Sequence, residues 1–93
     1  MRTDEILEMA RSLPMSCPDA VGDYGTHSSA LISVGGRLDK LLSDASVVSD
    51  RGQLDIVATK KYIGMQVLIL ASLCHLLAIE LDECISLGKG ELS

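Results

Sequence analysis

Aromatic residues are almost missing from this sequence. It has no Phe and no Trp, and its two aromatic residues are Tyr24 and Tyr62. Hydrophobic residues still make up 47% of the 93 residues, which excludes a chain that is disordered by composition. A core without Phe or Trp must be built from Leu, Ile, Val, Met and Ala, and such cores are typical of packed helices. We therefore expect a single all-α domain over residues 1–93.

Basic runs are also missing, and we expect no secretory leader. The eight Lys and Arg residues are scattered, with Lys60 and Lys61 as the only adjacent pair, and the net charge is −5. Binding to a nucleic-acid backbone needs a cationic face, so direct nucleic-acid binding is not expected. The first 15 residues are charged rather than apolar, which disfavours a signal peptide. Three cysteines, an odd number, favour reduced thiols in a cytoplasmic protein.

Charge is missing altogether from the longest apolar segment, residues 62–79. This segment is close to the lower limit for a bilayer span, and Gln66, Ser72 and His75 interrupt it, so we expect no membrane insertion. A helix that is apolar all round must be buried all round, and 93 residues cannot easily bury it alone. We therefore predict a homodimer or tetramer. The predicted oligomer interface consists of Met65, Leu68, Ile69, Ser72 and His75.

Apolar residues at helical spacing predict four helices, over residues 3–13, 26–45, 53–77 and 81–87. Thr3 is expected to cap the first helix, and Asp50 or Ser49 the third. The segment 14–25 has two Pro and two Gly and is predicted to be a loop, and residues 88–93 are predicted to be a frayed tail after a stop at Gly88. Gly35 and Gly36 lie inside the second helix, which suggests a close helix approach or a kink.

The order of these parts resembles a known family. A short helix, a helix with the pattern V-G-x-R-L, a long apolar helix and then LCHLLAIELDECI are similar to the MazG-like all-α nucleoside triphosphate pyrophosphohydrolases. The family has a segment L-A-x-x-L-G-I-D-L-E-E-A after its third helix. Ala78 stands at the Gly of this form and Glu80 at the Asp, and the residues that fit it are Leu73, Leu77, Ile79, Leu81, Asp82 and Glu83. The resemblance covers about residues 30–87 and implies a helical scaffold that forms dimers or tetramers.

The carboxylates that the family uses for chemistry are missing here. The family holds Mg²⁺ with E-E-x-x-E on its second helix and E-x-x-D on its third. The aligned positions in this sequence carry no carboxylate: they are Ser33, Val34, Arg37, Tyr62 and Met65. The resemblance therefore implies a relative that has lost the metal site and binds no cofactor. Mg²⁺ would bind only if displaced carboxylates, such as Asp39 and Asp55, replaced the missing ones.

The other residue groups in the sequence do not form a recognisable metal or catalytic site. Cys74 and His75 are adjacent on a helix and point about 100° apart, so they cannot easily share one zinc ion. The pattern contains no nucleophile elbow and no phosphate loop, so we assign no catalytic residue. An acidic group at the expected start of the fourth helix is a possible partner surface. It consists of Glu80, Asp82 and Glu83.

The sequence alone thus favours a non-catalytic, homo-oligomeric helical protein that binds or occludes a macromolecular partner, in the manner of the small regulators or inhibitors that phages and mobile elements encode. A protein partner is expected, but its identity does not follow from the sequence. One alternative is a divergent MazG-like pyrophosphohydrolase with displaced carboxylates. Another is a small helical chaperone or structural subunit.

Overall fold

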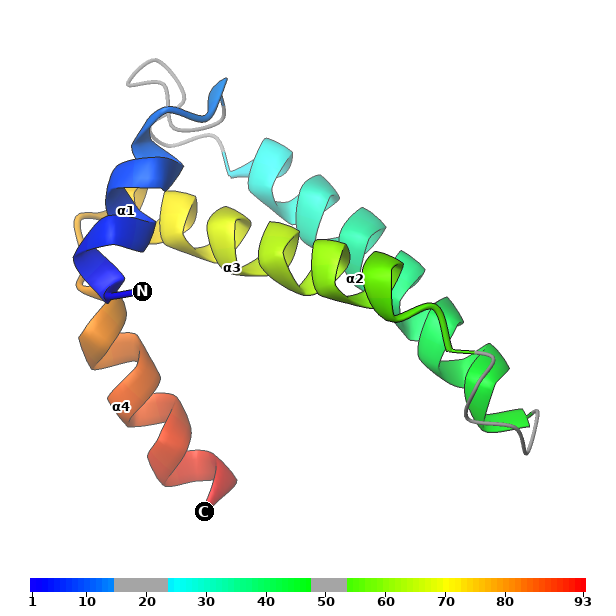
Figure 1. Ribbon diagram of the computed structural model, residues 1–93. Helices are drawn as coiled ribbons and strands as arrows, with labels where there is room; N and C mark the ends of the chain where they lie inside the picture. The colour runs from blue at the N-terminus through cyan, green and yellow to red at the C-terminus, as the bar shows by residue number, and fades with distance from the viewer. Residues whose placement is uncertain (15–23, 48–53) are drawn as a thin grey trace.

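The computed structural model describes residues 1–14, 24–47 and 54–93, and these residues form four helices and no strand (Figure 1). The helices are α1 (Thr3–Arg11), α2 (Gly25–Val47), α3 (Ile56–Leu77) and α4 (Leu81–Leu92). The prediction of an all-α fold with a long apolar third helix is confirmed for this part of the chain. Most of the predicted loop over 14–25 lies outside the described residues, and Gly25 already belongs to α2.

The two long helices, α2 and α3, lie side by side and antiparallel (Figure 1). Gln66 of α3 reaches across to α2, where its side-chain Nε2 donates a hydrogen bond to the Leu31 carbonyl oxygen at 3.4 Å. A Cβ added to Gly35 would lie 3.2 Å from that Nε2 atom. The close helix approach predicted for the pair Gly35 and Gly36 is therefore confirmed at Gly35, where the missing side chain leaves room for the Gln66 amide. A Cβ added to Gly36 would meet nothing within 4 Å.

Two helix starts differ from the predictions. The Arg2 carbonyl accepts hydrogen bonds from the N–H groups of Glu5 and Ile6, so Arg2 occupies the N-cap and Thr3 is the first helical residue. Helix α3 begins at Ile56 rather than at residue 53, since Asp55 is its N-cap. The Asp55 Oδ1 atom accepts from the N–H of Ala58 at 3.0 Å. The predicted caps Ser49 and Asp50 lie outside the described residues.

The corner between α3 and α4 is a Schellman motif. The N–H of Ala78 donates to the His75 carbonyl, and the N–H of Ile79 donates to the Cys74 carbonyl. Ala78 adopts the left-handed conformation, with φ 55° and ψ 41°. This conformation normally favours glycine, because a Cβ atom is strained there. The corner thus turns the chain sharply and directs α4 away from the α2–α3 pair (Figure 1).

Replacing Ala78 with glycine should stabilise the protein. The substitution removes a left-handed strain of about 1–2 kcal/mol, and the greater freedom of glycine in the unfolded chain offsets part of that gain. We expect a net gain of about 0.5–1 kcal/mol, which corresponds to a few degrees in Tm for a domain of this size. Thermal unfolding followed by circular dichroism measures the shift. Ala30→Gly inside α2 is the control and should lower Tm; a fall in both variants would contradict the assigned corner geometry.

Helix α4 continues past the predicted stop at Gly88 and ends at Leu92. The prediction that the helix ends at Gly88 and that 88–93 is a frayed tail is therefore wrong for residues 88–92. Glycine at Gly88 and Gly90 inside a helix costs about 1 kcal/mol each relative to alanine. A helix of 12 residues with two such positions is marginal on its own and depends on packing for its stability.

The interior that holds these helices together is small. A cluster of Ala10, Ala71, Cys74 and Leu81 joins α1, α3 and α4, and Ile6, Leu7 and Cys84 pack against it. Val34 and Ile69 are the other buried apolar residues among those described. The molecule is elongated as a result, with extents of 45 × 29 × 22 Å.

Candidate interaction surface

Helix α3 presents three apolar faces, and the first of them packs on α2. Ile69 is 5% exposed on this face and lines a narrow groove between the helices. The other residues that line this groove are Leu13, Ala30, Val34, Met65 and Leu68. The first face of α3 is therefore covered by α2 within a single chain.

A buried polar pair also joins α2 to α3 on this side. The His27 Nε2 atom and the Ser72 Oγ atom are 2.8 Å apart, and the two residues are 1% and 0% exposed. A serine and a histidine at this distance can form a nucleophilic pair, but a nucleophile must be reached by its substrate. Ser72 is sealed inside the helix pair, so this contact ties α2 to α3 and does not form a catalytic site.

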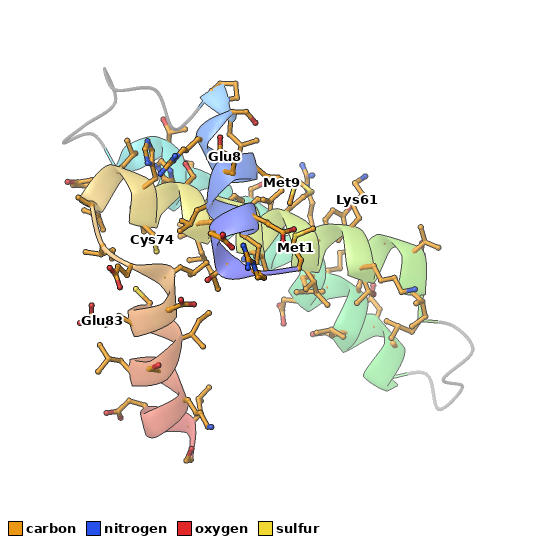
Figure 2. All side chains as sticks on the ribbon, turned by 60° about the vertical axis from the view of Figure 1, so that its left-hand side comes forward. Met1, Glu8, Met9, Lys61, Cys74 and Glu83 are labelled. Carbon is orange, nitrogen blue, oxygen red and sulfur yellow. The ribbon has the colours of Figure 1, made fainter. Side chains whose placement is uncertain are left out.

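The second face of α3 packs on α1, which crosses it (Figure 2). Ala10 of α1 and Ala71 of α3 are both completely buried, and these two small side chains let the helices approach closely. Met1, Ile6 and Met9 of α1 line a shallow groove with Gly64, Val67 and Leu68 of α3. Met1 and Met9 extend over this groove and remain partly open to solvent.

The third face of α3 is apolar and half-exposed, except at Cys74, which α4 covers. We call it the α3 stripe, and it consists of Ile56, Ile63, Val67, Leu70 and Leu77. Ile56, Ile63, Leu70 and Leu77 follow one another every seven residues, which places them on one side of the helix. Their side chains are between 41% and 51% exposed. A continuous apolar stripe of this kind is typical of a surface that another helix covers.

At its C-terminal end the α3 stripe opens into a groove between α3 and α4. The groove has a volume of about 340 Å³. Its lining is almost wholly apolar and comes from both helices: Leu70, Leu73, Cys74, Ile79, Leu81, Cys84 and Ile85. The α3 stripe and the inner side of α4 therefore form one apolar surface inside the angle of the two helices.

Two free thiols, Cys74 and Cys84, line this groove, and Figure 2 shows the position of Cys74. Their sulfur atoms are 4.0 Å apart, and Cys74 is the more buried of the two. Burial raises the pKa of the Cys74 thiol above its usual value, and the hydrogen bond and charge of Cys84 raise this pKa further. Cys74 therefore stays protonated at neutral pH and serves as an apolar packing residue.

The structure divides the predicted oligomer interface. Ile69 and Ser72 are buried against α2 within the chain, so they are not available to a second copy. Met65 and Leu68 are half-buried in the grooves beside α1 and α2, whereas His75 is exposed. The residues that sequence reasoning missed are those of the α3 stripe. Their spacing of seven was visible in the sequence, but a helix apolar on every side gives no signal of which side the fold leaves open.

The predicted partner surface and the candidate metal ligands lie apart from one another. Glu80, Asp82 and Glu83 are all exposed at the start of α4. Asp55 accepts from the Ala58 N–H, and Asp39 accepts from the Ser43 hydroxyl at 3.3 Å. In residues 1–14, 24–47 and 54–93, no group of three His, Cys, Asp or Glu side chains could hold a metal ion. The described structure thus offers no acidic cage for Mg²⁺.

Comparison with protein-family models, with curated proteins and with solved structures finds no match to this chain. The structure itself identifies α3 as the one described helix that is long and apolar enough to cross a membrane, with a mean hydropathy of 1.4 over 18 residues. Only 17% of that window is buried inside the molecule. The α3 stripe contributes to this low burial, since its residues are 39–51% exposed.

Proposed function

We propose that this protein is a homo-oligomeric helical module that acts through contact with a macromolecular partner and not through catalysis. The observation that supports this proposal is the α3 stripe, which a second copy would cover. Apolar area removed from water contributes about 25 cal/mol per Å², so large exposed apolar side chains along one helix favour association strongly. The stripe takes the place of the interface that the sequence assigned to the buried side of α3.

The surface area of the chain supports the same proposal. The chain exposes 6718 Å². A compact protein of 9.9 kDa exposes about 5,200 Å² by the usual scaling with mass. The radius of gyration is 15.1 Å, against about 12 Å for a compact chain of 93 residues. The excess area is larger than the ~800 Å² that each partner loses in a standard interface.

An oligomer held in this way presents a second surface for partners. The acidic residues Glu80, Asp82 and Glu83 are exposed in the single chain at the start of α4. Partner binding at this position would act by occlusion. The charge complementarity that it provides favours a partner with a basic patch.

The dependence of thermal stability on protein concentration tests this proposal. Folding that is coupled to association gives a Tm that rises with concentration, because mass action favours the assembled state. We expect Tm to rise by several degrees between about 1 and 100 μM, measured by circular dichroism with cells of different path length. A sharp transition at one Tm over the whole range would contradict self-association.

The same protein also permits a test against the enzyme alternative. We expect no release of phosphate or pyrophosphate from a panel of nucleoside triphosphates with Mg²⁺ or Mn²⁺, and no shift in Tm when nucleotide is added. Turnover that is lost in Asp39→Asn and Asp55→Asn would instead support a pyrophosphohydrolase with displaced carboxylates. These variants separate the chain's own activity from a contaminating enzyme, since a contaminant would act equally in all samples.

A further inference from the structure

We infer that the occupant of the α3 stripe is helix α4 of a second copy of this chain, so that two copies exchange their C-terminal arms. This inference rests on the proposed self-association and specifies its geometry. Each arm would leave its own corner at Ala78 and lie along the N-terminal part of the stripe on the other copy, from Ile56 to Leu70. Because the exchange is reciprocal, the contact closes as a two-fold dimer.

The first support is that α4 has an apolar stripe of its own. Leu81, Ile85, Gly88 and Leu92 follow one another at spacings of four and three residues, so they share one side of the helix. Leu81 is buried in the chain's own interior, whereas Ile85 and Leu92 are 55% and 92% exposed. The arm is thus anchored at its first turn and extends away from the body beyond it (Figure 1). A helix with two internal glycines needs a packing partner, and within one chain this arm has an apolar side with little to pack on.

The two surfaces agree in length. Helix α4 has 12 residues and is about 18 Å long, and the part of the stripe from Ile56 to Leu70 spans about 21 Å.

The shape of the molecule favours a helix over a lipid surface as the occupant. Helices α3 and α4 enclose an angle (Figure 1), and Leu70 of the stripe lines the groove between them together with Leu81 and Ile85 of α4. A bilayer surface is flat and would be held off the stripe by the projecting arm. A single helix about 10 Å wide fits such an angle and buries its apolar side on the walls.

Charge substitutions on the two sides of α4 test the inference. Ile85→Glu places a charge on the apolar side of the arm, and Leu87→Glu is the matched control on the other side, where Leu87 is 69% exposed. We expect Ile85→Glu to weaken association at least 100-fold in sedimentation velocity, and Leu87→Glu to change it less than threefold. Equal dimer masses for both variants and the wild type would overturn the inference and leave the proposed self-association intact. A monomeric wild type would overturn both the inference and the proposed self-association, whether or not it floats with vesicles of phosphatidylcholine and phosphatidylglycerol.

Cross-linking between separate chains locates the arm directly. In a background with Cys17→Ser, Cys74→Ala and Cys84→Ala, one chain carries Ile63→Cys and the other carries Ile85→Cys. Mixing the two chains with diamide should give a covalent heterodimer on a non-reducing gel. Diamide is the oxidant and accepts the two electrons that the two thiols lose as each disulfide forms. Leu87→Cys replaces Ile85→Cys in the control and should give at least tenfold less product. Equal yields, or no product in a background that still sediments as a dimer, would show that α4 does not lie on the stripe.

Discussion

Ile69→Asp should unfold this protein. Ile69 is 5% exposed and packs between α2 and α3, so an aspartate there would place a charge in the apolar interior without a partner. Loss of the buried isoleucine contacts and burial of a carboxylate together cost about 4 kcal/mol or more, which is most of the stability of a small domain. Far-UV circular dichroism at 20 °C should show loss of most helical signal, with no cooperative thermal transition.

An Ile69→Asp chain that keeps both its helical signal and its Tm would contradict the assigned packing. A change at the same position without charge provides the control, since Ile69→Val removes one methyl group and should cost about 1 kcal/mol. Ile69→Val should therefore remain folded with a modestly lower Tm. The contrast between the two variants separates the effect of charge from the effect of volume.

Ile63→Asp should leave the chain folded but monomeric. Ile63 lies on the same helix as Ile69, but its side chain is 49% exposed on the α3 stripe. The same substitution six residues away therefore removes little from the interior of a single chain and places a charge in the proposed interface. A desolvated, unpaired charge costs at least about 3 kcal/mol, which is more than a 100-fold loss in association constant. Size-exclusion chromatography with light scattering at 50 μM should show a folded species with half the wild-type mass.

The outcome for Ile63→Asp separates a low mass caused by lost association alone from a low mass that accompanies unfolding. A variant that both dissociates and unfolds would show that the chain folds only as part of the dimer. In that case, adding wild-type chain in excess should not restore the helical signal of the variant. If it remains a dimer with wild-type affinity, the α3 stripe is not the interface. A substitution of Lys61→Gln, on an exposed position outside the stripe, controls for the change in net charge, since it also makes the chain more negative by one unit.

How far the sequence determines this structure differs between elements. Helical spacing was sufficient for the existence of all four helices, because apolar residues at three and four positions apart have few other solutions. Helical spacing did not predict the end of α4. Glycine often ends a helix, but α4 continues through Gly88, and the left-handed residue that ends a helix is Ala78 after α3. The cap at Asp55 was also missed, since several acidic and hydroxyl residues before α3 compete for that role.

The interaction surface was less predictable for a physical reason. Sequence reasoning recognised that residues 62–79 cannot all be buried by one small chain, and this expectation remains the basis of the proposal. It could not decide which side of α3 the chain covers itself. That choice depends on the Ala10–Ala71 approach and on the His27–Ser72 pair, which join residues far apart in the sequence. The proposed interface therefore moved from the Ile69 side to the Ile63 side of one helix.

The solution mass of the wild-type chain is the most direct evidence for or against self-association through the α3 stripe. Sedimentation equilibrium between about 1 and 200 μM should give twice the chain mass of 9.9 kDa at the higher concentrations. The mass should fall toward that of one chain on dilution, and Ile63→Asp should sediment as one chain throughout. A wild-type chain that is folded and has a mass of 9.9 kDa at every concentration would contradict the account, because its exposed apolar stripe would then have no second copy to cover it.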